Sequence, residues 1–104
     1  MVALAGQIGW DAAGQFADGF SAQFARALDN LLVALAAAGG APADLVSVRV
    51  YVVDKRQYVA AAKDIGAAWR ERLGKHYPAM ALLEVKGLLE DAALVEIEGL
   101  AVVE

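Results

Sequence analysis

The stretch LVSVRVYVV, residues 45–53, decides the fold, because every second position in it is a valine. Valine is β-branched and favours strands, and successive side chains of a strand point to opposite faces of its sheet. The stretch therefore predicts a strand with a valine face that packs against the rest of the domain. This valine face consists of Val46, Val48, Val50 and Val52. The other face carries Arg49 and Tyr51.

One amphipathic helix is predicted on each side of this strand. Upstream, apolar residues recur every three or four positions and form one stripe: Phe20, Phe24, Leu28, Leu31 and Leu35. Asp18 is predicted to cap this helix, and the glycines 39 and 40 end it because glycine adopts left-handed backbone without strain. Downstream, Asp54 is predicted to begin a second helix that runs to Gly74, with Arg70 and Arg72 in its last turn.

Three further strands complete the pattern. Residues 2–8 are short and apolar, and residues 79–86 and 93–103 are strand candidates joined by GLLEDA. The resulting order is β-α-β-α-β-β. Two helices with one apolar stripe each cover one face of a four-stranded mixed sheet, so we predict an α+β fold in a single domain over residues 1–104.

The last strand indicates what happens on the sheet face without helices. Its alternation places Val95, Ile97, Gly99, Ala101 and Val103 toward the helices, and Leu94, Glu96, Glu98, Leu100 and Val102 on the opposite face. A solvent-exposed face is seldom so apolar, so we expect copies of the chain to pack there. Arg49 is the predicted partner of Glu98, and both are expected to form an ion-pair network with Glu84.

Composition excludes several classes of function. The chain has 104 residues with 13 acidic and 9 basic side chains, a net charge of −4, one histidine and no cysteine. Cysteine nucleophiles, disulfide scaffolds and metal centres of His and Cys are therefore excluded. Neither Ser21 nor Ser47 lies in a G-x-S-x-G motif. The acidic balance and the lack of a basic run argue against nucleic acid as a partner.

The sequence shows neither the features of a signal peptide nor those of a membrane-spanning segment. The apolar N-terminal stretch has no basic region of the kind that signal peptides carry, and no apolar run is long enough to cross a bilayer. We therefore expect a cytoplasmic protein with no membrane partner, and the residue inventory predicts no metal centre of His or Cys.

Five segments occur together in a familiar order and spacing: AGQIGWDAAGQ, LLVALAAAGG, VSVRVYVVDKRQY, HYPAMALLEV and VEIEGLAVV. Together they resemble the reactive intermediate deaminase family, also called RidA, YjgF or L-PSP, from Gly6 to Val103. The resemblance implies a chorismate-mutase-like fold and a homotrimer whose sheets form a central barrel. Small-molecule ligands would bind in three clefts between neighbouring subunits. It further implies hydrolysis of reactive enamines or imines to ammonia and an oxo acid without a cofactor.

The resemblance also assigns site residues. Glu96 aligns with the glutamate that positions water in deaminating members and is the catalytic candidate, and Gly6 aligns with the glycine whose backbone faces the ligand. Met80 stands where active members have an arginine that clamps the substrate carboxylate with two hydrogen bonds. Three other positions that are often polar in the family are also apolar here: Ala5, Ala62 and Leu82. Family members usually have one more upstream strand with a cleft tyrosine, and this sequence has no counterpart to it.

Each candidate has a structural alternative. Glu96 is expected to carry a proton near neutrality because aliphatic neighbours raise the pKa of a carboxyl group, or else it is a salt-bridged interface residue. Met80 and Leu82 line a ligand cleft, or they are ordinary packing. Trp10 and Tyr77 lie in loops and either wall the cleft or fill the interface. His76 is predicted to be a solvated loop residue rather than a catalytic one.

Three functions remain open from the sequence. The first is a cofactor-free hydrolase or deaminase of an enamine or imine, with a cleft more apolar than usual. The alternative is a non-catalytic trimer that binds a small ligand or a partner protein in the same clefts. The endoribonuclease or translation-inhibitor activity associated with the family is the least favoured, because the chain is acidic and has no basic patch.

Overall fold

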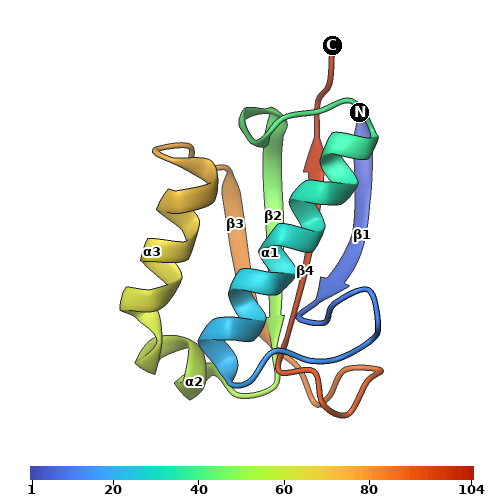
Figure 1. Ribbon diagram of the computed structural model, residues 1–104. Coiled ribbons are helices and arrows are strands. Elements are labelled where there is room, and N and C mark those ends of the chain that lie inside the picture. The colour runs from blue at the N-terminus through green and yellow to red at the C-terminus, as the bar shows by residue number, and fades with distance from the viewer.

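The computed structural model describes residues 1–104 and has two layers, a sheet and a layer of helices (Figure 1). The elements are β1 (Val2–Ile8), α1 (Phe20–Ala37), the 3-10 turn η1 (Pro42–Asp44), β2 (Leu45–Val52), α2 (Lys55–Ala60), α3 (Ala62–Leu73), β3 (Ala79–Glu84) and β4 (Val95–Ala101). The strand order is β1-β4-β2-β3, in which β4 is antiparallel to both its neighbours and β3 is parallel to β2. The predicted α+β fold with a four-stranded mixed sheet is confirmed.

The core lies between α1 and the sheet. The predicted stripe of α1 is buried, and Leu28, Leu31 and Leu35 are completely shielded from solvent. They pack in one cluster with Val95 and Ile97 of β4, the face that alternation assigned to the helices. None of the helices combines the length and apolarity that a membrane span requires.

A β-bulge near the start of β2 corrects the predicted valine face. Leu45 pairs with Ala101 and Ser47 pairs with Leu100, so Val46 is the extra residue on β2. Leu45 is 1% exposed, whereas Val46 is 44% exposed. The prediction is therefore wrong at Val46 and confirmed at Val48, Val50 and Val52, which are buried. One inserted residue moves every side chain before it to the other face of the sheet.

The ends of the helices differ in part from the prediction. Asp18 does not cap α1, because Gly19 with φ 88° occupies the N-cap position and no side chain bonds there. Asp54 does cap α2, and its carboxylate accepts a hydrogen bond from the backbone N–H of Arg56 at 3.0 Å. The single helix predicted up to Gly74 is two helices, because the backbone turns at Ala61 with φ −94° and ψ 10°.

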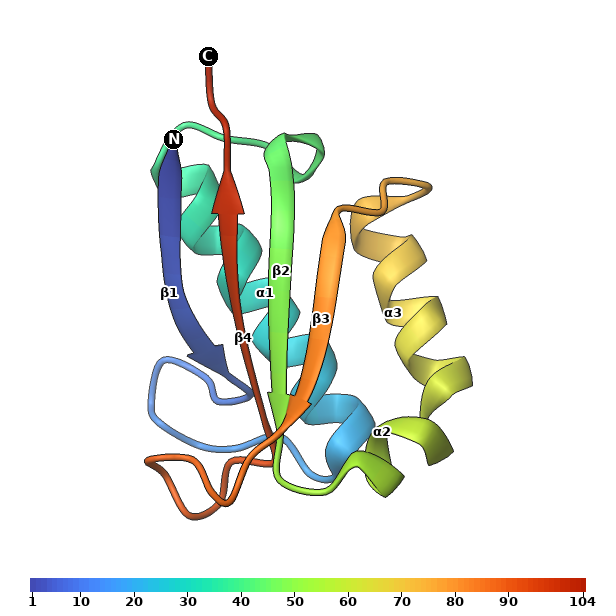
Figure 2. The ribbon, with the colours of Figure 1, turned by 180° about the vertical axis from the view of Figure 1, so that it is seen from behind.

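The sheet face opposite the helices is uncovered within one chain (Figure 2). Arg49 Nη1 lies 3.4 Å from Glu98 Oε1 on this face, so the predicted pair is confirmed. The Tyr51 hydroxyl also donates to Glu98, and this hydrogen bond raises the pKa of Tyr51 above its ordinary value. Glu84 is not part of the network: its carboxylate accepts from the backbone N–H of Lys55 at 2.9 Å, because it lies at the far end of β3.

Candidate functional site

Apart from Leu82, the predicted site residues lie in two pockets at opposite edges of the sheet. The first, here called the acidic pocket, has a volume of about 270 Å³ and is lined by Gly6, Gln7, Ile8, Trp10, Leu89, Glu90 and Glu96. The second, the aromatic pocket, has a volume of about 250 Å³ and includes Phe24, Tyr58, Trp69, Arg70, Tyr77 and Met80 in its lining. They share no residue, and β1 and β3 are the two edge strands. One chain therefore brings Glu96 together with Gly6 and Trp10, but not with Met80.

The acidic pocket is built around Glu96, whose side chain reaches from β4 across β1. A Cβ atom at Gly6 would collide with the Glu96 carboxylate, so the absence of a side chain at position 6 makes room for it. Glu96 is partly buried and makes no ion pair or side-chain hydrogen bond within the chain. Its carboxylate is thus free to bind a ligand or a water molecule in the pocket.

The loop after β1 holds Trp10 at the wall of the acidic pocket. The side-chain amide of Asn30 on α1 donates to the carbonyl oxygens of Ile8 and Trp10, both at 2.9 Å. The Trp10 ring also packs on Phe16, with centroids 5.5 Å apart. Sequence reasoning missed Asn30, although an asparagine inside an amphipathic helix is unfavourable by propensity and could have been a signal for such a role.

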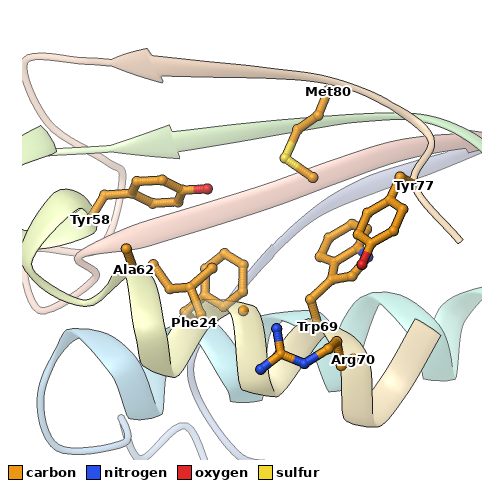
Figure 3. A pocket seen from close by; sticks show the side chains of 9 residues that line it. Phe24, Tyr58, Ala62, Trp69, Arg70, Tyr77 and Met80 are labelled. Carbon is orange, nitrogen blue, oxygen red and sulfur yellow. The ribbon is translucent and has the colours of Figure 1, made fainter. Parts of the chain in front are cut away.

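The aromatic pocket lies between the helices and the edge strand β3 (Figure 3). Phe24 of α1, Tyr58 of α2 and Trp69 of α3 form its walls, and Met80 points into it from β3. The Tyr58 ring meets Phe24 edge-on at a centroid distance of 6.3 Å, and burial raises the pKa of Tyr58 above its ordinary value. Leu82, the next residue on this face of β3, is 40% exposed and lies outside both pockets.

His76 corrects another expectation, because it is a structural residue rather than a solvated one. Its Nε2 atom lies 2.8 Å from the carbonyl oxygen of Leu45, and its own carbonyl accepts from the indole N–H of Trp69 at 2.9 Å. These bonds tie the loop after α3 to both layers. They place the following residue, Tyr77, beside the aromatic pocket, where its side chain is 68% exposed.

Neither pocket presents a set of side chains that would hold a metal, since no group of three or more His, Cys, Asp or Glu residues comes together. The acidic pocket offers a free carboxylate for proton transfer. The aromatic pocket offers apolar surface with one cation, Arg70, and two phenol hydroxyls.

Comparison with known proteins places this geometry in a family. Residues 1–103 match the family model described as Endoribonuclease L-PSP. A Rid family protein from Yersinia pestis is 34% identical with a TM-score of 0.82, over 98% of this chain and 77% of that one. The YjgF gene product of E. coli is 30% identical with a TM-score of 0.83, over 94% of this chain and 76% of that one. RidA from an Antarctic Psychrobacter is 28% identical with a TM-score of 0.81, over 96% and 79%.

No curated protein matches the chain at a significant level. The family model nevertheless covers nearly every residue, and the solved structures agree with it in fold across more than nine tenths of the chain. The chain therefore belongs to the Endoribonuclease L-PSP family, and the solved structures that it matches include proteins named YjgF and RidA.

Proposed function

We propose that this protein hydrolyses a reactive imine or enamine without a cofactor, releasing ammonia and leaving an oxo compound. The observation that supports this most directly is the free Glu96 carboxylate over Gly6 in the acidic pocket. A carboxylate in this position accepts a proton from the water that attacks the imine carbon. It passes this proton to the nitrogen, which gives a carbinolamine. It then takes the proton of the new hydroxyl group and delivers it to the amine, so the C–N bond breaks and ammonia leaves as the C=O bond forms.

The proposed site needs two copies of the chain. Glu96 and Met80 line pockets at opposite sheet edges, so one ligand can contact both only where the β1 edge of one chain meets the β3 edge of the next. Such a contact joins two different surfaces and repeats around a ring, instead of closing a two-fold dimer. The family resemblance implies a ring of three, with the uncovered sheet faces of Figure 2 inside it. We therefore propose a homotrimer with a cleft between each pair of neighbours.

The protein is expected to have three times the 10.9 kDa mass of one chain in light scattering at micromolar concentration. The physical reason is the uncovered sheet face, where the alternation of β4 places the partly exposed Leu100 next to the bonded Glu98. Burying this face between copies removes apolar surface from water. A mass of 10.9 kDa across the same concentration range would contradict the proposed assembly.

The activity is tested on imines that an amino acid oxidase generates in situ from phenylalanine, leucine or alanine. Semicarbazide traps free imine, so an imine hydrolase lowers the yield of the trapped product and speeds ammonia release. We expect the largest effect with apolar or aromatic side chains, because the aromatic pocket supplies apolar surface. If no imine is consumed faster, the chain is a ligand-binding trimer, an alternative favoured by the lack of any carboxylate in the aromatic pocket.

We do not propose RNA cleavage, although the family model carries an endoribonuclease description. The acidic pocket contains Glu90 and Glu96 and no basic side chain, and the net charge of the chain is −4. Both features oppose the binding of a phosphate backbone.

Gly6→Ala is expected to lower turnover without disturbing assembly. The new methyl group takes the place of the Glu96 carboxylate, and the flexible end of that side chain moves more cheaply than the backbone. A displaced catalytic group costs on the order of 10²-fold in rate. The measurement is kcat together with the light-scattering mass. Gly87→Ala is the matched control, because a Cβ atom added there would have no neighbour within 4 Å, and equal rates in the two variants would contradict the placement of Glu96.

A further inference from the structure

Arg70 of α3 lines the aromatic pocket and has no partner within the chain. The other two arginines on α2 and α3 are paired: Arg56 with Asp54 at 3.0 Å and Arg72 with Asp29 at 2.6 Å. The acid next to Arg70, Glu71, lies 3.5 Å from Arg72 and does not pair with Arg70. Arg70 makes neither an ion pair nor a side-chain hydrogen bond, so its positive charge is available to a ligand.

The backbone of α3 determines where this cation lies. One turn before Arg70 is Gly66, and a Cβ atom there would lie 3.2 Å from Arg70 Nη1. The missing side chain lets the guanidinium lie along α3 at the side of the pocket, across from Met80 on β3 (Figure 3). Gly66 itself lines the pocket, so the cation and the apolar surface are adjacent.

The remaining lining of the pocket favours a flat apolar body. Aromatic rings from Phe24, Tyr58, Trp69 and Tyr77 surround the space, and such rings bind another ring by edge-on or offset contacts. The Met80 thioether adds a polarizable group that packs well against aromatic rings. The volume of about 250 Å³ is below the range of roughly 300–1,000 Å³ found for drug-sized ligands. The pocket therefore fits a small single-ring compound.

We propose that Arg70 binds the carboxylate of a small aromatic carboxylic acid whose ring occupies the aromatic pocket. The inference rests on the proposed function and names its substrate class: imino acids with an aromatic side chain, and the oxo acids formed from them. The family resemblance implies a carboxylate-binding arginine on the strand, at the position of Met80. In this chain the carboxylate would instead be bound from the helix on the other side of the pocket. A guanidinium suits this role because it donates two parallel hydrogen bonds to a carboxylate.

Calorimetric titration with two probes of the same shape tests the proposal. The probes are 3-phenylpropanoate and its uncharged amide, 3-phenylpropanamide. The wild type should bind the acid more tightly than the amide. Arg70→Gln should weaken binding of the acid about tenfold and leave the amide unchanged, because a hydrogen bond to a charged group is lost. Arg70→Lys keeps the positive charge but does not offer two parallel hydrogen bonds. Its affinity for the acid should therefore lie between that of the wild type and that of Arg70→Gln.

Arg26→Gln is the matched control. Arg26 is an exposed arginine of α1 without an ion-pair partner, and it lines neither pocket. This variant should bind both probes as the wild type does. If the wild type shows no preference for the acid, or if Arg70→Gln binds the acid as tightly as the wild type, the proposal is overturned.

The failure of this proposal can be told apart from the failure of the proposed function. Binding of the probes involves no turnover, so Glu96→Gln should retain the acid preference even when hydrolysis is lost. Imine hydrolysis together with unchanged binding in Arg70→Gln would reject only the role of Arg70. The expected binding pattern without any hydrolysis would reject only the enzyme activity.

Discussion

Glu96→Gln is expected to abolish imine hydrolysis while the assembly stays intact. Glutamine keeps the size and the hydrogen-bonding reach of glutamate, but its amide does not accept a proton from water at neutral pH. Removal of a positioned acid or base typically costs about 10²–10⁴-fold in rate. The value of kcat/KM for the best imine should therefore fall by this amount, measured by ammonia release, at an unchanged light-scattering mass.

Glu98→Gln is the comparison that separates chemistry from packing. Glu98 lies on the same strand and the same face two residues away, but it is held by Arg49 and Tyr51. Its loss should affect assembly and thermal stability more than the chemical step. Wild-type activity in Glu96→Gln would show that Glu96 is a structural residue and would remove the main support for an enzyme.

Met80→Arg is expected to produce partial activity on 2-aminoacrylate and its imine, on which the wild type should be nearly inactive. These compounds have no ring to fill the aromatic pocket, and the chain has no charged group at the strand position where the family pattern has an arginine. The new guanidinium would supply one. A gain of about tenfold is the expected size for a charge-assisted hydrogen bond in a partly exposed site. Ammonia release is measured while a lyase makes 2-aminoacrylate in situ.

The recovery should stay partial for two physical reasons. The new cation would lie among Phe24 and Trp69 without an acidic partner, which costs stability, although position 80 is 44% exposed and water reduces that cost. It would also lie across the pocket from Arg70, so two like charges oppose each other until a carboxylate binds. Met80→Leu, which keeps the volume and adds no charge, should show no gain. Robust hydrolysis of 2-aminoacrylate by the wild type would contradict this account.

The sequence alone was sufficient for the order of elements and for most of the core. The apolar stripe of α1 and the alternation of β4 indicate which side chains face the interior. Where one face of an element is buried, apolar residues recur with the period of a helix or of a strand. The same reasoning predicted the Arg49–Glu98 pair, since both residues fall on one sheet face. The resemblance to a known family located Gly6 and Glu96, and the aromatic side chain in a loop pointed to Trp10. The structure brings all three into one pocket.

Local pattern failed where one residue changed the geometry of the backbone. Val46 repeats the valine period perfectly, yet the bulge moves it to the exposed face. Ala61 is a good helix former, and nothing in its identity marks the turn between α2 and α3. Both features depend on how neighbouring elements dock, so a pattern of apolar and polar residues does not contain them.

Contacts between distant segments were decided by the tertiary structure alone. His76 bonds to the carbonyl oxygen of Leu45, and Asn30 bonds to the loop after β1, across separations in sequence that no periodicity spans. Arg70 looks from the sequence like a surface charge that complements the end of a helix. The fold leaves it exposed but places it beside four aromatic rings contributed by three helices and a loop. Side-chain periodicity reports which face of its own element a residue occupies, whereas a binding site depends on which other elements that face meets.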